Sequence, residues 1–457
     1  MDCLPYLTSD LPGIGGRIKE DVTDFRVDEV PLYVLAGEGT HVFFKVTKRG
    51  VPTPAAVERI ARHMGVHPTE IGFAGLKDSQ GVTKQLMSLE HADTERLKQF
   101  RDSQVSVELV SRHGNKLRAG HLLGNRFHVR IRGVGADRLE QARAILAVLQ
   151  ARGVPNYFGE QRFGARGDTG RLGEMLVRND ADAFIKAYLG QPLPSDPPDC
   201  KAAREAFDAG LFNRALERWP RHFSNERRAL SAYKKRKHAG PALGAIDKRL
   251  KRLYVSAFQS EIFNEVLVQR LPTLHRVFPG DMCIKPNGAI FYVIDAAAEQ
   301  ARADALEIHP TGPIIGFRSH LAGPEGMTAA EPQATSHQPQ GDRPTEADEA
   351  ALDTVESQGE DIQALEPAPL NQPTQPGEVN PGQIERDVLA SHHVTTEDFR
   401  HVGALKVKGT RRALRFGITE ADLQVGTDPR GDFLEVSFFA PSGCYATVVL
   451  REIMKTE

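Results

Sequence analysis

The strand-forming patterns of this chain lie near its two ends, and a mostly helical stretch separates them. Segments in which apolar and polar residues tend to alternate, "HVFFKVT", "VSVELV" and "FHVRIR", predict strands before residue 133. Near the other end, "FLEVSFFA" and "YATVVLRE" flank "PSG" and predict a β-hairpin. Helical periodicity predicts helices over 53–65, 138–153 and 252–271. A sheet drawn from both chain ends around a helical insertion is an α+β fold.

The length of 457 residues exceeds one typical domain. The change in pattern predicts an N-terminal part over 1–155, an inserted and mostly helical α/β domain over 156–404, and a C-terminal part over 405–457 that completes the sheet. Within the insertion, residues 319–385 hold about 13 Asp and Glu, a single Arg and no aromatic side chain. Such a segment buries too little apolar surface to fold, so we expect disorder there, with one short helix near "EADEAALDTVES". The ordered chain is expected to resume near Arg386.

Charge is unevenly distributed along the chain. The formal net charge is −2, but the acidic segment carries about −12, which leaves about +10 for the rest. An excess of that sign is expected of a protein that binds a polyanion. Residues 225–253 contain about ten Lys and Arg against two acids, which favours phosphate contact over a solvated helix face. Residues 156–173 combine Arg162, Arg166 and Arg171 with two Phe-Gly pairs, a pattern found in nucleic-acid surfaces and in ordinary linkers.

Several classes of protein are not expected. No apolar run reaches the length of a membrane helix, and the start "MDCLPYLTSDLPG" does not have the pattern of a secretory signal. The four cysteines lie far apart, which argues against structural zinc or a disulfide framework and favours a reducing cytoplasm. No phosphate-loop, Rossmann or zinc-protease motif occurs in its required context, so neither a cofactor nor a metal is expected.

The loop "FAGLKDSQGVTKQ" (residues 73–85) holds the first candidate for chemistry. Asp78 follows Lys77, and a neighbouring lysine keeps a carboxylate ionised, as a nucleophile or base requires. A turn-capping aspartate is the commoner meaning of this pattern, so the loop alone does not decide. In "GHLLGNRFHVRIRG", Phe127 is either a core residue or an aromatic face for a nucleic-acid base beside Asn125, with the neighbouring arginines on phosphates.

The most specific stretches are "AGLKDSQGVTKQ", "GNRF" and "NYFGEQRFG". Six further stretches, which lie before and after these three and outside the acidic segment, contribute to the resemblance by their sequence and their order along the chain. They are "IKEDVTDFRVDEV", "GTHVFFKVTKRG", "LYVSAFQSEIFNEVL", "HPTGPIIG", "KGTRRALRF" and "GCYATVVLRE". Together they resemble the TruD family of tRNA pseudouridine synthases. The acidic segment departs from the compact bacterial pattern of that family, and it is either a spacer or a regulatory element.

The resemblance implies isomerisation of uridine to pseudouridine in tRNA, with uridine 13 as the usual bacterial target. It implies a mixed, largely antiparallel sheet in a catalytic domain formed by 1–155 and 405–457, interrupted by a TRUD insertion domain over 156–404. Asp78 matches the family's catalytic aspartate. Positions of the substrate pocket are matched by Lys19, Lys77, Phe25, Asn125 and Phe127, of which Phe127 is the aromatic residue that stacks on the target base. The expected partner is tRNA, without cofactor or metal, and we expect a cytoplasmic monomer.

Three alternatives stay open. One is a synthase of the same family that acts on another RNA position. Another is a non-catalytic tRNA-binding or chaperone protein with the same fold, although the intact Lys77-Asp78 and "GNRF" elements count against it. The third is a metal-dependent nuclease, which is remote because no acidic cluster has ligand spacing.

Overall fold

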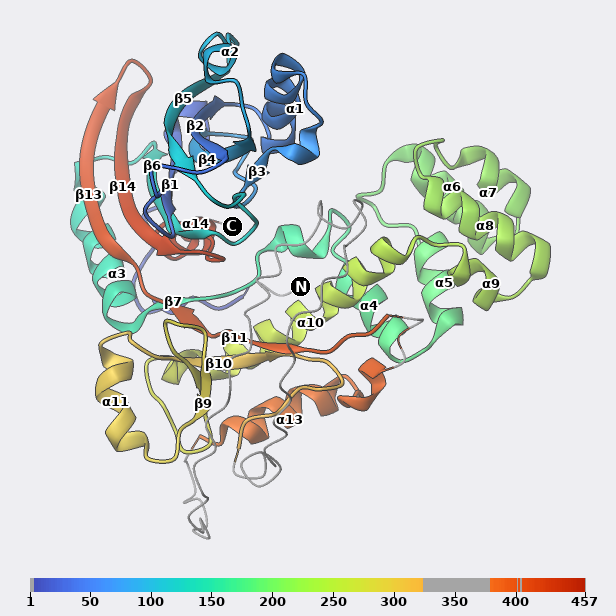
Figure 1. Cartoon of the computed structure of the whole chain (residues 1–457). Coiled ribbons are helices and arrows are strands. Elements are labelled where there is room, and N and C mark those ends of the chain that lie inside the picture. The colour runs from blue at the N-terminus through green and yellow to red at the C-terminus, as the bar shows by residue number, and fades with distance from the viewer. Residues whose placement is uncertain (1–3, 324–378, 401, 403–404, 457) are drawn as a thin grey trace. The chain divides into compact units, whose positions relative to one another are not determined.

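The computed structural model describes residues 4–323, 379–400, 402 and 405–456 (Figure 1). Most of the acidic segment, with its predicted disorder and its predicted helix, lies outside these residues. The chain divides into two compact units, and the boundaries fall inside the short strands β7 (Val154–Pro155) and β12 (Arg415–Phe416). The described residues of 6–154 and 416–457 are called the sheet unit below, and those of 155–415 the helical unit.

The sheet unit holds eight strands in the order β13-β14-β6-β1-β4-β2-β5, with β3 paired to β4. Strands β1 and β4 are parallel, and the other neighbouring pairs of this sheet are antiparallel. Because β13 and β14 come from the C-terminal part of the chain and lie beside β6, both chain ends build this sheet. This mixed sheet, together with the helices, confirms the predicted α+β fold. The strands are β1 (Phe25–Pro31), β2 (His41–Arg49), β3 (Gly72–Phe73), β4 (Val82–Glu90), β5 (Val105–His113), β6 (Leu122–Arg132), β13 (Thr419–Asp428) and β14 (Gly431–Pro441).

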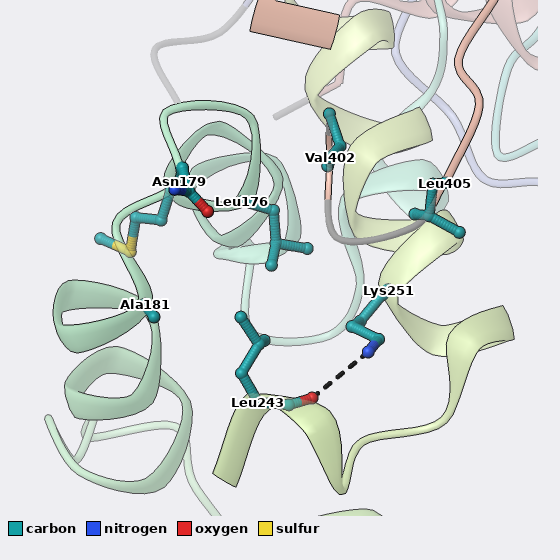
Figure 2. Close-up of a pocket in the computed structure, with 8 residues that line it drawn as sticks. Leu176, Asn179, Ala181, Leu243, Lys251, Val402 and Leu405 are labelled. Carbon is teal, nitrogen blue, oxygen red and sulfur yellow. Dashed lines mark hydrogen bonds between the residues drawn. The ribbon is translucent and has the colours of Figure 1, made fainter. Parts of the chain in front are cut away.

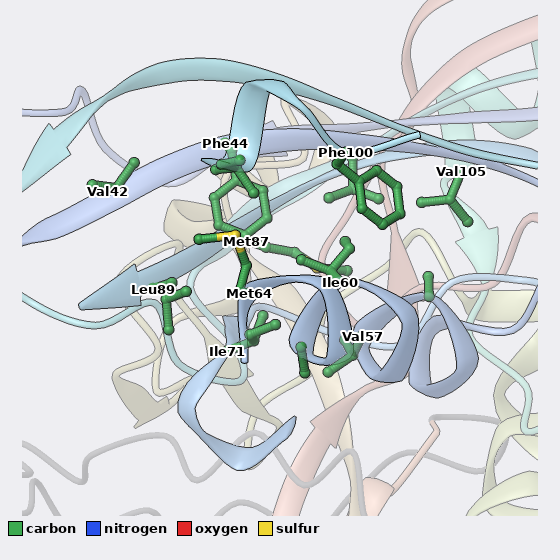
Figure 3. Packing of buried hydrophobic residues seen from close by; sticks show 14 of the residues in the cluster. Val42, Phe44, Val57, Ile60, Met64, Ile71, Met87, Leu89, Phe100 and Val105 are labelled. Carbon is green, nitrogen blue, oxygen red and sulfur yellow. The ribbon is translucent and has the colours of Figure 1, made fainter. Parts of the chain in front are cut away.

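Helix α1 (Thr53–Met64) confirms the helix predicted over 53–65, and it covers one face of the sheet near β2 and β4. It has Pro54 in its first turn and ends at Gly65, whose φ of 72° is the left-handed conformation that glycine adopts without strain. Its apolar stripe packs on alternate residues of β2 and β4 (Figure 3). The buried cluster includes Val42, Phe44, Val57, Ile60, Met64, Met87 and Leu89. Burial of this stripe, more than local propensity, holds the helix on the sheet. The unit also contains α2 (Thr94–Lys98) and α3 (Leu139–Arg152).

The C-terminal segment is a helix, so the predicted strand over 445–452 is wrong. Helix α14 spans Ala446–Met454, and the strand over 433–440 pairs with β13 instead. Ala446, Val449, Leu450 and Ile453 are all buried at helical spacing, which the β-branched run "TVV" concealed. The buried carboxylate of Glu452 accepts the backbone N–H groups of residues 7 and 8 at 2.9 and 3.1 Å, and so fastens the N-terminal segment to this helix.

The helical unit contains the long core helix α10 (Lys248–Arg270) and a four-stranded sheet in the order β11-β10-β8-β9. Helix α13 begins at Pro381, before the position near Arg386 at which folded structure was predicted to begin again. It buries Glu385, which accepts the N–H of Ala322 at 2.8 Å. The described helices of the whole chain include none that is long and apolar enough to cross a membrane. The other elements are α4 (Thr169–Val177), α5 (Ala181–Leu189), α6 (Pro198–Asp208), α7 (Phe212–Arg218), α8 (Ser224–Arg236), α9 (Ala239–Gly244), β8 (Met282–Ile284), β9 (Ile290–Tyr292), α11 (Ala296–Asp304), β10 (His309–Ile314), α13 (Pro381–Ser391) and β11 (Thr410–Ala413).

Candidate active site

Asp78 lies in the loop between β3 and β4, within the sheet unit. Its Oδ1 accepts the backbone N–H of Gln80 at 2.8 Å, and about a third of the side chain stays exposed. The nearby Gly81 passes so close to β1 that a Cβ there would lie 2.5 Å from the carbonyl oxygen of Phe25. The loop is therefore packed tightly against β1, while its carboxylate stays accessible to a substrate.

The cation that pairs with Asp78 is Lys19, which precedes β1. Its Nζ donates to Oδ2 of Asp78 and lies 4.4 Å from the centroid of the Phe25 ring. Lys19 has a φ of 61°, a conformation uncommon for a residue with a Cβ. Burial acts to raise the pKa of Asp78, but the hydrogen bonds from Lys19 and Gln80, with the charges of Lys19 and Lys48, outweigh it and hold that pKa below its ordinary value. The carboxylate is therefore ionised at neutral pH.

Lys77 points to a different group from its neighbour. Its Nζ lies 2.8 Å from Oε2 of Glu29 and donates to Oδ1 of Asn125 at 2.8 Å. Glu29 and Asn125 are direct cross-strand partners on β1 and β6, so the sheet register brings them together. The Lys77 and Glu29 side chains are only 5% and 2% exposed. Glu29 was not predicted as a site residue, although a charged residue within the strand-like run "FRVDEV" could have indicated it.

Phe127 lies two residues beyond Asn125 on β6 and faces the same side of the sheet. Its ring contacts Phe25 edge-on at 6.2 Å and Phe438 at 5.3 Å, the latter being its cross-strand partner on β14. Phe127 is 7% exposed and Phe25 3% exposed. The structure thus places Lys19, Phe25 and Asp78 in one contact network, and Phe127 adjoins it through Phe25. A base can stack on Phe127 only through the small exposed part of the ring, so the stacking role stays a prediction.

The arginines of β6 do not offer free positive charge. Arg126 pairs with Glu420 at 2.6 Å, and Arg130 pairs with Glu435 at 2.9 Å. Arg132 pairs with the buried Asp24 at 2.6 Å and also with Asp428. Their engagement with carboxylates in the sheet unit argues against the suggested phosphate contacts of this strand.

The two basic stretches of the helical unit differ in how far their cations are already engaged by other side chains. In 156–173, Arg166 pairs with Asp168 at 2.7 Å and Arg162 donates to Ser260 at 3.2 Å, so both serve the packing of the unit, whereas Arg171 is exposed. In 225–253, by contrast, several cations are exposed and have no carboxylate in ion-pair range among the residues that the structure describes. These residues on α8 and the start of α10 are called the basic face: Arg228, Lys234, Lys235, Lys248 and Arg252.

A separate recess in the helical unit contains none of the predicted catalytic or substrate-binding residues. It is mostly apolar and is lined by Leu176, Leu243, Val402 and Leu405, and Lys251 at its edge donates to the carbonyl of Leu243 at 3.3 Å (Figure 2). None of its residues belongs to the predicted site. Within the described ranges, no group of three or more His, Cys, Asp or Glu side chains is arranged to hold a metal ion.

Comparison with known proteins bears on the whole chain. A sequence model of the family tRNA pseudouridine synthase D (TruD) matches residues 3–335 and 328–453. A tRNA pseudouridine synthase D of Geotalea daltonii is 38% identical over 454 residues, which cover 99% of this chain and 100% of the relative. One of Geobacter metallireducens is 37% identical over 452 residues, 98% and 97% of the two chains.

A solved structure shares the fold. The crystal structure of a Methanosarcina mazei protein assigned to tRNA pseudouridine synthase D aligns with a TM-score of 0.77 at 24% identity, over 99% of this chain and 96% of that one. At that identity the likeness concerns the fold alone. The sequence matches show the family, and they agree with the predicted enzyme class. This chain belongs to the TruD family of tRNA pseudouridine synthases.

Proposed function

We propose that this protein isomerises a uridine of tRNA to pseudouridine, with uridine 13 as the target and Asp78 as the nucleophile or base. The observation that carries the proposal is the half-buried carboxylate of Asp78, paired with Lys19 and bordered by the Phe25 ring. An ionised carboxylate with restricted solvent access is the group that attack on a sugar or a base requires.

The reaction is an isomerisation, so its bonds and protons balance without a co-reactant. The N1–C1′ bond breaks, the detached uracil turns, and a C5–C1′ bond forms, while C5 loses one proton and N1 gains one. Asp78 begins glycosidic cleavage, either by covalent attack or by removal of a ribose proton, and both routes stay open. It also serves as the base that takes the C5 proton. Lys19 keeps this carboxylate ionised until the bond breaks.

A stacked uridine has to leave the folded RNA before Asp78 can reach it. Extrusion costs a few kcal/mol, and stacking on an aromatic side chain returns about 1–3 kcal/mol per base. We assign that stacking to Phe127, with Phe25 and Asn125 as its neighbours in the pocket. All six proposed site residues lie in the sheet unit of one chain, so the site needs no second copy. We therefore expect a monomer, working in the cytoplasm where tRNA is modified.

The basic face of the helical unit is suited to the RNA backbone. Asn225 on α8 accepts the N–H of Asp247 at 2.9 Å, which ties the start of α8 to the start of α10. Lys234 and Lys235 lie in the last turn of α8. Each phosphate that such a cation neutralises contributes about −0.9 to the slope of log affinity against log salt for a duplex. Replacing Lys234 and Lys235 by Gln should therefore weaken tRNA binding and reduce the salt slope by about 1–2. An unchanged slope would exclude this face from RNA binding.

The activity test uses tRNA that carries tritium at C5 of uridine, in buffer with a metal chelator. We expect the wild type to release tritium and to convert one uridine, and Asp78→Asn to release none while it binds tRNA normally. Asp102→Asn is the matched control, because Asp102 also accepts the N–H of the residue two positions on, at 2.8 Å, and pairs with Arg59 at 3.0 Å. Normal turnover by Asp78→Asn would refute the assignment.

The same assay separates the remaining candidates. Conversion of a uridine other than position 13 would keep the enzyme and change its target. Binding of tRNA without tritium release would favour a chaperone. Loss of activity on adding the chelator would favour metal chemistry instead.

A further inference from the structure

Lys48 and Gln85, two buried polar side chains of the sheet face that α1 covers, lie near the buried Thr53 at the start of α1. Alternate residues of β2 on this face are Val42, Phe44, Val46 and then Lys48, and their partners on β4 are Leu89, Met87, Gln85 and Thr83. Lys48 has no exposed surface, Gln85 is 1% exposed, and Thr53 at the start of α1 is 1% exposed. The face is therefore apolar at one end and polar at the other.

These three side chains direct their hydrogen bonds to the backbone of the Asp78 loop. Lys48 donates from Nζ to the carbonyl oxygen of Asp78 at 2.7 Å and to that of Lys77 at 3.3 Å. Thr53 accepts the N–H of Lys77 at 3.0 Å, and Gln85 donates to the carbonyl of Gly75 at 3.1 Å. Thr53 also donates to Gln85 at 2.9 Å, so the two are held relative to each other. Lys48, Thr53 and Gln85 are called the loop clamp below.

A lysine is unusual at a fully buried position of a β-strand such as that of Lys48. A buried ammonium loses its hydration, and no carboxylate side chain among the described residues lies within ion-pair distance of it. Burial lowers the pKa of Lys48 to about 8, although the negative charge of Asp78 opposes that shift. An apolar side chain would fill this position without the loss of hydration. The interactions that account for a lysine here are therefore its hydrogen bonds to the two loop carbonyls.

We propose that Lys48 is a positioning residue for catalysis, which holds the backbone of Lys77 and Asp78 so that the Asp78 carboxylate stands at the reacting nucleotide. The inference rests on the proposed role of Asp78. Two carbonyl groups on successive residues, held by one buried ammonium, fix the backbone in the middle of the loop. A displacement of about 1 Å at a reacting group costs about 100-fold in rate. The positive charge beneath the loop also favours the ionised form of Asp78.

The test compares Lys48→Met with Lys45→Met, because Lys45 lies on the same strand but is exposed. Single-turnover rates on tRNA and the Kd for tRNA are measured for both. We expect Lys48→Met to lower the rate constant about 100-fold with Kd within about twofold of the wild type. Lys45→Met should leave the rate constant and Kd unchanged. Lys48→Arg should recover part of the rate, since it returns a buried cation with several donors.

A second pair of variants keeps the inference testable if Lys48→Met does not fold. Thr53→Val removes the acceptor of the Lys77 N–H with little change of volume, and Thr53→Ser retains it. We expect Thr53→Val to lower the rate constant at unchanged Kd and Thr53→Ser to behave as the wild type.

A wild-type rate for Lys48→Met, or for Thr53→Val where the first does not fold, would overturn the inference. So would equal losses in rate constant and affinity. Asp78→Asn, measured alongside, separates this failure from that of the proposed function. If Asp78→Asn is inactive while the clamp variants turn over normally, only the positioning role falls. If Asp78→Asn is active, both the proposed role of Asp78 and the inference that rests on it are wrong.

Discussion

Replacing Lys19 by Met should move the acidic limit of catalysis towards neutral pH. Lys19 makes the charged contact to Oδ2 of Asp78, and the two side chains are only 18% and 31% exposed, so the contact is partly shielded from water. A hydrogen bond to a charged group contributes about 1.5–3 kcal/mol, and one unit of pKa corresponds to about 1.4 kcal/mol. Loss of the contact should therefore raise the pKa of Asp78, because burial then acts with less opposition.

The sign of the effect follows from the direction of the shift. In the wild type the pKa of Asp78 lies below its ordinary value near 4, so the carboxylate is ionised across the working range. The single-turnover rate should then stay level from about pH 8 down to about pH 5 and fall only below that. In Lys19→Met the fall in rate should begin at a higher pH than in the wild type. The ion pair also stabilises the fold above the ordinary pKa of aspartate, and this contribution is lost as the pH falls through the lowered value.

The assay is tritium release under single-turnover conditions between about pH 4.5 and 8, with thermal unfolding recorded at each pH. The control is Lys84→Met, which breaks an exposed ion pair between Lys84 and Asp28 at 3.2 Å. The Lys84 side chain is 47% exposed and that of Asp28 is 38% exposed. Its pH profile should match the wild type. An unchanged acidic limit in Lys19→Met would refute the electrostatic role of Lys19, and a reduced rate at every pH would indicate a role in geometry alone.

Other substitutions test the packing around the site. Phe127→Leu keeps most of the buried volume but removes the ring, so tritium release should fall about tenfold or more with a small change in thermal unfolding. Proportionate losses of tritium release and of thermal stability would make Phe127 a core residue only. Glu29→Gln leaves the ammonium of Lys77 buried without its carboxylate and should lower the free energy of unfolding by about 3–5 kcal/mol in denaturant titrations; adding Lys77→Met should restore part of it, and additive losses would contradict the pairing. Gly81→Ala places a Cβ against the Phe25 carbonyl and should cost about 1–3 kcal/mol and slow the reaction, which an unaltered melting curve would disprove.

The outcome for Lys77 and Asp78 shows why adjacency in the sequence did not decide which lysine pairs with the aspartate. Successive residues of extended backbone point to opposite sides, so a lysine beside an aspartate need not be its partner. Here Lys77 turns to Glu29 and Asn125 across β1 and β6, and Asp78 turns to Lys19 from the N-terminal segment. The sequence placed both lysines near the site through the family resemblance, but not their partners.

A similar limit applies to the helix at the C-terminus. The run "YATVVLRE" has the β-branched composition of a strand, and local composition favours a strand there. The decisive contact is distant, because Glu452 receives the N–H groups of residues 7 and 8 and the apolar side of α14 is buried. Burial against the rest of the unit overrides a weak local preference.

What the sequence by itself determined was the set of strongly periodic elements, the interrupted α+β arrangement, the loop that holds Asp78, and the family. These depend on patterns within a dozen residues or on motifs in a fixed order. Only the tertiary structure decided which lysine meets the aspartate, which arginines are already paired, and that Lys48 lies beneath the loop. Each of these contacts joins residues from separate strands or segments, and their meeting depends on the order and register of strands that are distant in the sequence.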